Sequence, residues 1–381
     1  MRFFSKLKNS IQVYIKNTDK LLILLCTLAS LYGLVLVYST TVTAGRSLRD
    51  VVVQLAAFIL GMVVAIFISQ IDYEAICTLW PIWAGVSLIL MILTYIGGIG
   101  LNAVGTDDTA WLEIFGISFQ PSELMKIVFI VTFAKHLSLV RDHINELKTV
   151  LLLCLHGGLP IALVFKQGDD GTALVFILMF VSMMFAAGLK PLYFLIALTG
   201  GCAILPFIWD KLIKEKMGRI LCLFFVDEYL SEEGWQQYEG LVATGSGQLW
   251  GKGFLGGQKD FFARNNDMIF TVAGEEFGFI GAVALLALLL LIVWELWRCA
   301  ITARDRLGMY ICIGVMSLIG FQSLINIGMN LRVLPVIGIT LPFISAGGSS
   351  SATLYLGIGL ALSVYFSSRA RVRNTIFSKP L

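Results

Sequence analysis

Ten runs of about 20 apolar residues restrict the fold of this chain more than any other feature of its sequence. A helix needs about 20 apolar residues to cross a bilayer core, where only helices and closed barrels satisfy their own backbone polar groups. Charged residues make up 14% of the 381-residue chain, whereas they make up about 25% of a soluble domain. The sequence therefore predicts an all-α, polytopic membrane protein with ten transmembrane helices. The predicted spans are residues 21–40, 51–69, 79–99, 120–139, 148–166, 171–188, 191–209, 267–294, 307–334 and 351–368.

The positions of Lys and Arg indicate the orientation of these spans, because basic residues are enriched in cytoplasmic segments. They concentrate in the N-terminal tail 1–20, in the C-terminal tail 369–381 and after the even-numbered spans. We therefore expect both termini to be cytoplasmic and to flank a ten-span domain of residues 21–368. The first span has no small-residue cleavage site after it, so we interpret it as a retained span and not as a signal peptide.

One connection, residues 210–266 between the seventh and eighth spans, is the only large polar insertion, and we expect it to be extracytoplasmic. Long loops in compact folds are usually functional or disordered, and its Trp, Phe and Gly content argues against disorder. Its first part, residues 210–230, is predicted to form an amphipathic helix at the membrane interface.

Charge and cysteine content exclude two other classes of protein. A net charge of +3 is too small to indicate a nucleic-acid partner. The seven cysteines show no CxxC or Cys/His ligand spacing, so neither a disulfide framework nor a metal site is expected.

The stretch 242–281 carries the strongest chemical signal, because a glycine-rich basic loop leads through Asp267 into an apolar helix. Asp267 either caps this helix or acts as a general base toward a hydroxyl nucleophile, and the neighbouring bases favour the second interpretation. Gly251 and Gly253 lie in a GxGxxG match, but no βαβ unit surrounds it, so we reject a dinucleotide site. These glycines either let the backbone turn sharply near a ligand or make the loop flexible.

Two glutamates, Glu275 and Glu276, follow two helical turns after Asp267. Adjacent residues point in different directions on a helix, so at most one of them is expected to face a given cavity. They either take part in catalysis or form a buried ion pair with a base on another helix, and we favour the structural ion pair. Lys126, one turn after Glu123, is the expected partner.

Two more segments carry polar groups at the ends of predicted spans. Asp169 and Asp170 begin a predicted helix at the outer surface, where they either cap it or supply a supporting carboxylate or a metal ligand. Residues 341–357 place Pro, Gly and Ser between the last two spans, which indicates either a cavity lining or close helix packing.

These motifs, in this order along nearly the whole chain, resemble the SEDS family of bacterial cell-wall synthesis proteins, which has RodA-like and FtsW-like members. The motifs that carry the resemblance are ISQIDY at 68–73, FQPSELMKI at 119–127, DDGTALVF at 169–176, DMIFTVAGEEFGFIGA at 267–282 and LPFISAGGSS at 341–350. The resemblance implies a ten-span peptidoglycan glycosyltransferase in the bacterial cytoplasmic membrane, with its active site facing outward. Such proteins polymerise lipid II beside a class B penicillin-binding protein, in cell elongation, division or sporulation.

The resemblance also implies roles for single residues. The family's essential aspartate matches Asp267, its QPSExxK lysine matches Lys126, and the acid of its DxGTA segment matches Asp169. We therefore expect Asp267 to activate a sugar hydroxyl that attacks a second lipid-linked sugar with inversion and releases polyprenyl diphosphate. Lys126, Arg219 and Lys252 are candidates for stabilising this diphosphate. A divalent cation, Mg²⁺ or Mn²⁺, could share that task, but no ligand set is legible in the sequence.

The sequence departs from the family pattern at several positions. Arg332 stands where glycine is common, Ala346 stands where tyrosine is common, and Ala263-Arg264 replace a Pro-Glu pair. Ala110 stands directly before Trp111, where the family usually has Arg. The GKG loop at 251–253 favours a RodA-like over an FtsW-like member. Two other functions stay open: flipping of lipid-linked precursors, since interrupted helices are typical of transporters, and a non-catalytic scaffold for the synthase.

Overall fold

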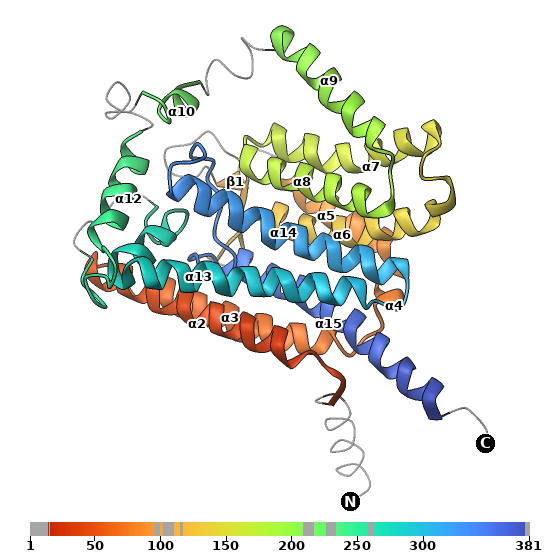
Figure 1. Cartoon of the computed structure of the whole chain (residues 1–381), viewed down its shortest axis with the longest axis horizontal. Coiled ribbons are helices and arrows are strands. Elements are labelled where there is room, and N and C mark those ends of the chain that lie inside the picture. The colour runs from red at the N-terminus through yellow and green to blue at the C-terminus, as the bar shows by residue number, and fades with distance from the viewer. Residues whose placement is uncertain are drawn as a thin grey trace, which may run out of the picture.

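The structure is a computed structural model, and it describes residues 14, 16–94, 100–101, 110–114, 117–208, 217–225, 234–257 and 263–377 (Figure 1). Its longer helices are α2 (Lys20–Thr43), α3 (Arg49–Ile68), α5 (Trp80–Leu93), α6 (Pro121–Leu139), α7 (Leu147–Lys166), α8 (Asp170–Ala187), α9 (Pro191–Ile208), α13 (Ile269–Ile301), α14 (Arg306–Asn330) and α15 (Gly348–Phe377). The shorter elements are α4 (Tyr73–Thr78), η1 (Arg141–His143), α10 (Met217–Leu221), α12 (Trp235–Ser246), β1 (Gly100–Leu101), β2 (Trp111–Ile114) and β3 (Ile117–Phe119).

A helix lies in each of the ten predicted spans. Within the described residues, seven helices are long and apolar enough to cross a membrane: α2, α3, α7, α8, α13, α14 and α15. Helices α5 and α9 are apolar but shorter, and α6 carries Glu123, Lys126 and Lys135. The chain is therefore a mostly helical, polytopic membrane protein.

The structure differs from the prediction at several boundaries. The connection 100–119 contains a small antiparallel sheet of order β1-β2-β3, in which Leu112 pairs with Phe119, and the all-α prediction did not include it. Helix α14 ends at Asn330, before the predicted end at residue 334, because Arg332 adopts a φ of 58° that a right-handed helix does not accommodate. Helix α15 continues to Phe377, past the predicted end at residue 368. Within the predicted interfacial helix 210–230, the described part holds only α10 and the turn after it.

Helix α14 is at the centre of the bundle. It packs against α13, α8 and α6, while α15 packs against α3 and α2 packs against α13. The most apolar stretch of α14 is 67% buried, against 22% for that of α3, so α14 faces protein and α3 mainly faces the membrane. Apolar residues from α6 and α8, including Phe129, Phe133 and Phe176, form part of the core between these helices.

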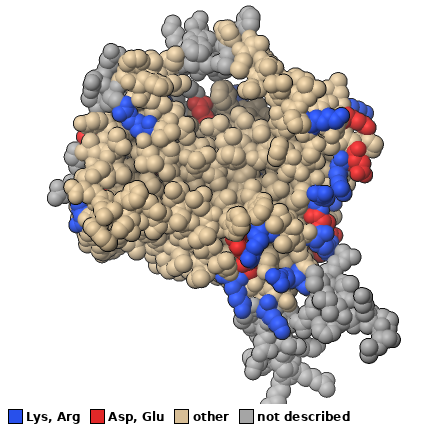
Figure 2. All heavy atoms as spheres, in the orientation of Figure 1, with Lys and Arg blue, Asp and Glu red and all other residues tan. Residues whose placement is uncertain are grey.

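The two ends of the bundle differ in what they carry. The start of α2 and the end of α15 lie at the same end of the bundle (Figure 1), and Figure 2 shows many Lys and Arg side chains along the edge nearest to them, beside a broad uncharged face. Helix α12 and the first turns of α13 lie toward the opposite end, and α9 projects away from the bundle. Helix α13 is 33 residues long and is kinked at Gly278, which has φ 66° and ψ −165°.

Candidate active site at the start of helix α13

Asp267 lies at the end of the 210–266 loop, two residues before α13 begins. Its backbone carbonyl accepts hydrogen bonds from the amides of Asn326 and Asn330, each at 2.8 Å. Met268 is the N-cap residue of α13, with no side-chain cap, so the Asp267 carboxylate does not cap this helix. Within the described part of the chain, this carboxylate has no hydrogen bond or ion pair, and it lies near Gly338. The main chain of Asp267 is fixed, and its carboxylate is available to a ligand.

The environment of Asp267 suits a general base. Its pKa is raised to about 6, first because the surrounding protein desolvates the carboxyl group and second because Asp169 adds a negative charge. When the pKa of a general base lies near the pH of the reaction, much of the base is in its ionised form and that form still binds a proton well. Asp267 is therefore mainly ionised at neutral pH and still able to accept a proton.

Asp169 brings the starts of α6 and α8 to the same place. Its carboxylate caps α8 by accepting the backbone N–H of Thr172 at 2.9 Å, and it accepts the side-chain amide of Gln120 at 2.8 Å. Burial raises the pKa of Asp169, while the bonds to Thr172 and the charge of Lys126 oppose this change. The capping interpretation of Asp169 is confirmed, and the same carboxylate also acts electrostatically on Asp267. Figure 2 shows the molecular surface hollowed toward its upper edge, with an acidic group visible inside the hollow.

Three amide side chains of α14 frame this region and were missed in the sequence. Gln322, Asn326 and Asn330 are spaced by four residues, so they share one helix face. Asn326 also donates to the carbonyl of Ile339 at 2.6 Å, and Gln322 donates to the carbonyl and the hydroxyl of Thr340 at 3.1 Å. The amides thus hold Asp267 and the segment after α14 in a fixed relation. Their i, i+4, i+8 spacing was the signal that could have identified them.

Lys126 forms a buried ion pair with Glu123, with 2.9 Å between its Nζ and the carboxylate. Its ammonium also donates to Gln322 at 3.5 Å, and Glu123 accepts the Thr353 hydroxyl at 3.5 Å. The pair therefore joins α6 to α14 and α15. The expectation that Lys126 is the partner of Glu275 or Glu276 is wrong, because the i, i+3 acid on its own helix takes that place.

Glu275 instead pairs with two bases of the outer loop. Lys252 contacts one carboxylate oxygen at 2.7 Å and Arg264 contacts the other at 2.5 Å. Glu275 and Arg264 are buried, whereas Lys252 is partly exposed. The adjacent Glu276 accepts bonds from the Ser39 hydroxyl and the Leu255 backbone. Both glutamates therefore attach the loop to the membrane helices.

The glycine-rich loop lies directly on the backbone of α13. The backbone N–H groups of Lys252 and Gly253 donate to the carbonyls of Glu275 and Glu276 at 2.9 and 3.0 Å. A Cβ on Gly251, which has a φ of 82°, would lie 2.1 Å from the Glu276 carbonyl oxygen. Gly253 has a φ of 91° but open space around it. Gly251 is thus needed because a side chain there would clash with the α13 backbone. Gly253 is needed because its turn has a positive φ that only glycine adopts readily.

The bases predicted to bind a diphosphate have different surroundings. Lys126 and Lys252 are each in an ion pair. Arg219 is exposed on α10, and its side chain makes no contact that the described part of the structure records. The structure brings Asp169, Glu123 and Lys126 together near Asp267, while Glu275 and Lys252 form a second cluster on α13.

A metal ion would need ligands beyond those that the protein supplies here. Within the described residues, no three His, Cys, Asp or Glu side chains form a group that could hold a metal ion. Asp169 already caps α8, which leaves Asp267 as the free carboxylate. Mg²⁺ is often held by one or two carboxylates together with substrate phosphates, and Asp267 with substrate oxygens would fit that pattern for Mg²⁺ or Mn²⁺.

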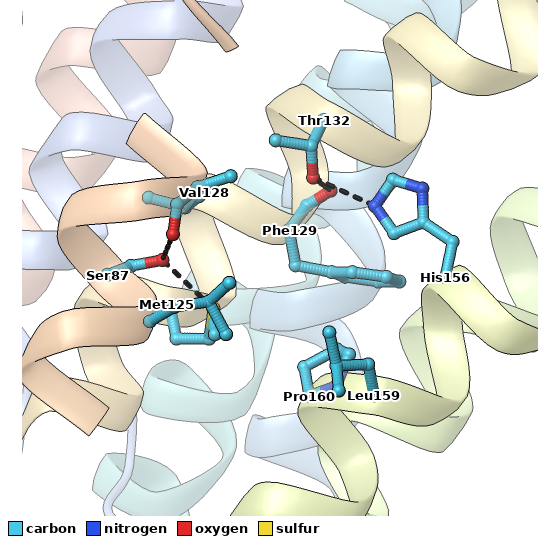
Figure 3. Close-up of a pocket in the computed structure, with 10 residues that line it drawn as sticks. Ser87, Met125, Val128, Phe129, Thr132, His156, Leu159 and Pro160 are labelled. Carbon is cyan, nitrogen blue, oxygen red and sulfur yellow. Dashed lines mark hydrogen bonds between the residues drawn. The ribbon is translucent and has the colours of Figure 1, made fainter. Parts of the chain in front are cut away.

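A small cavity of about 60 Å³ lies apart from these residues, between α5, α6 and α7 (Figure 3). Its wall is mainly apolar, and its polar groups bond within the protein: the Ser87 hydroxyl contacts the Met125 sulfur at 3.2 Å, and Thr132 contacts His156 at 3.1 Å. It contains none of the candidate site residues.

Known proteins resemble this chain over nearly its whole length. The family model described as "Cell cycle protein", named for FtsW, RodA and SpoVE, matches residues 19–370. The "Probable peptidoglycan glycosyltransferase FtsW" of Geobacter metallireducens is 33% identical over 373 residues, covering 92% of this chain and 95% of that protein. "Peptidoglycan glycosyltransferase MrdB" of Escherichia coli is 30% identical over 343 residues, covering 87% of this chain and 90% of that protein.

A solved structure shares the fold. It carries the description "Structural coordination of polymerization and crosslinking by a peptidoglycan synthase complex". It aligns with a TM-score of 0.76 and 27% identity, over 92% of this chain and 98% of the other.

Proposed function

The chain belongs to the FtsW, RodA and SpoVE family, and we propose that it uses Asp267 as the base of a peptidoglycan glycosyltransferase. It is an enzyme of peptidoglycan synthesis that serves cell shape or division. Its substrate in this proposal is lipid II, which it polymerises into glycan strands. The observation that carries the proposal is the Asp267 carboxylate, with a pKa of about 6, no bonding partner in the described chain and a fixed main chain.

The proposed reaction is an inverting glycosyl transfer. Asp267 accepts the proton of a sugar hydroxyl on one lipid-linked disaccharide while that oxygen forms a bond to the anomeric carbon of the other. The bond from this carbon to the diphosphate oxygen breaks, and the electron pair leaves with polyprenyl diphosphate. A positioned general base contributes about 10²- to 10⁴-fold to such a rate.

The departing diphosphate carries charge that the site must stabilise. Arg219 is the base best placed to do so, because it is exposed on the outer loop, whereas Lys126 and Lys252 would each have to exchange a carboxylate partner for phosphate. In this proposal Lys126 acts at a distance, and its charge also lowers the pKa of Asp169. A Mg²⁺ or Mn²⁺ ion, when bound with the substrate, would add positive charge at the diphosphate.

We place the enzyme in the bacterial cytoplasmic membrane with ten spans, both termini inside and the site facing outward. The basic tails and the basic connections after even-numbered spans support this orientation. The partner in this proposal is a class B penicillin-binding protein, supported by the likeness to a structure described as a peptidoglycan synthase complex. The RodA-like assignment from the GKG loop stays a prediction.

The test is Asp267→Asn in the purified protein with its partner, in vesicles that contain lipid II. The variant should lose polymer formation by at least 100-fold while binding lipid II as tightly as the wild type. Unchanged polymerisation would refute the catalytic assignment. If the wild type formed no polymer but flipped lipid II, the protein would be a transporter; if it did neither and still activated its partner, it would be a scaffold.

A further inference from the structure

Arg332 lies in the turn after α14 in an unusual backbone conformation. Its φ is 58°, in the left-handed region that residues other than glycine adopt only at a cost in free energy. Its guanidinium donates to the carbonyls of Cys222 and Leu223, each at 3.1 Å. These carbonyls directly follow α10, at a helix end where backbone carbonyls commonly bond to side chains. Charge-assisted bonds of this kind are stronger than neutral ones, so they offset the backbone cost.

A second side chain makes the opposite connection. Gln237 of α12 is buried, and its amide donates to the carbonyls of Met329 and Leu334 at 2.9 and 2.7 Å. The Cys222 thiol contacts the Gln237 side-chain oxygen at 3.7 Å. The turn after α14 therefore holds the end of α10, and α12 holds the end of α14. We call Arg332, Gln237 and Cys222 the outer clasp.

The outer clasp connects the two parts of the candidate site. On one side, α14 ends at Asn330, which together with Asn326 fixes the Asp267 carbonyl. On the other side, α10 carries Arg219, whose own carbonyl accepts the Cys222 thiol at 3.0 Å. If α10 moved away from this turn, Arg219 would move away from the end of α14, whose Asn326 and Asn330 amides hold the Asp267 backbone.

We propose that Arg332 is a positioning residue that holds α10 against the end of α14 and thereby places Arg219 for binding of the lipid-linked diphosphate. The role of Arg219 rests on the proposed function, whereas the attachment of α10 does not. Arg332 acts through Arg219 and makes no contact with the substrate itself. A glycine at this position would relieve the backbone and leave α10 unattached.

The experiment compares Arg332→Gly, Arg332→Lys and Arg219→Ala with the double variant Arg332→Gly/Arg219→Ala. Arg332→Gly should raise the KM for lipid II about 10-fold, the loss expected for about one charge-assisted hydrogen bond, and leave kcat within about twofold. Arg332→Lys keeps the positive charge but loses the planar guanidinium that donates to both carbonyls, so its KM should rise as well. The double variant should have the KM of Arg219→Ala alone, because both changes remove one interaction. Arg306→Ala, an exposed change at the far end of α14, is the control and should match the wild type.

Amide hydrogen exchange of residues 217–225 supplies a readout that does not depend on activity. Arg332→Gly should exchange faster there than the wild type, while the core of α14 stays protected. Unchanged exchange in Arg332→Gly overturns the proposal, as does an additive double variant. If Arg219→Ala leaves the KM unchanged, the diphosphate role of Arg219 is wrong, and the exchange result alone decides whether Arg332 holds α10.

Discussion

Acidification below pH 6 should slow polymerisation, because the reaction needs the ionised form of Asp267. With a pKa of about 6, the ionised fraction is about 0.9 at pH 7, about 0.5 at pH 6 and about 0.1 at pH 5. We therefore expect kcat/KM to be level above pH 7 and about tenfold lower at pH 5 than at pH 7. Initial rates of polymer formation from lipid II, with binding of lipid II measured in parallel, would separate this effect from titration of the substrate.

Asp169→Asn is the matched variant for this measurement. It removes the negative charge that helps to raise the pKa of Asp267, so the midpoint of the pH profile should move down. The midpoint should stay above 3.8, because desolvation is the larger cause and is unchanged. Asn is also a good helix cap, so its oxygen can keep the Thr172 N–H and α8 should keep its start. Its NH2 group replaces the oxygen that accepts from Gln120, and the Gln120 amide can rotate to present its own oxygen to that NH2. A rate independent of pH between 5 and 7, or the same midpoint in both proteins, would refute the reasoning.

Three further outcomes follow from the structure. Asp267→Asn should raise the midpoint of thermal unfolding at pH 7.5 by an amount equivalent to about 1–3 kcal/mol. The pKa of this carboxyl is about 6 in the folded protein against an ordinary value of 3.8, so the wild type loses stability as the pH rises from 3.8 to about 6, and the gain should vanish only below about pH 4. Scanning calorimetry in detergent at pH 7.5 and at about pH 3.5 measures it, and an equal gain at both pH values would contradict it. Gly251→Ala should unfold at clearly lower temperature than Gly253→Ala, because both have positive φ but only the first meets the α13 backbone; equal losses would show that the contact is unimportant. Glu275→Gln should destabilise by about 3 kcal/mol, because it removes the carboxylate that the buried Arg264 contacts, and denaturant titration would detect it.

Much of the helical fold could be predicted, because the length of each apolar run can be counted directly in the sequence. All ten predicted spans contain a helix. A helix forms its backbone hydrogen bonds within one segment, which an apolar environment requires. The sheet of β1, β2 and β3 could not be predicted, because two- to four-residue strands leave too little alternation to recognise. The early end of α14 depends on the backbone of Arg332, which the side chain alone does not indicate.

Part of the candidate site could also be predicted from the sequence, and part could not. Motif order identified Asp267, Asp169 and Lys126, and the structure places their charges within reach of one another. The partner of Glu275 could not be predicted, because its pairing depends on how the glycine-rich loop lies on α13, a tertiary contact with no sequence period. The amides of α14 share one helix face through their four-residue spacing, which is the signal that the sequence offers for them.

The length of α13 has a consequence for where the chemistry takes place. At about 1.5 Å per residue, its 33 residues reach about 50 Å, well beyond the roughly 30 Å of a hydrocarbon core. The part after the Gly278 kink is about 35 Å long and is sufficient to cross the core, so the first turns, about 14 Å long, can lie outside it. In the proposed orientation Asp267 therefore lies at the height that a sugar reaches when its prenyl tail stays among the lipids and its diphosphate rests at the headgroups. Both substrates would then react without leaving the bilayer, and the new strand would emerge directly on the wall side.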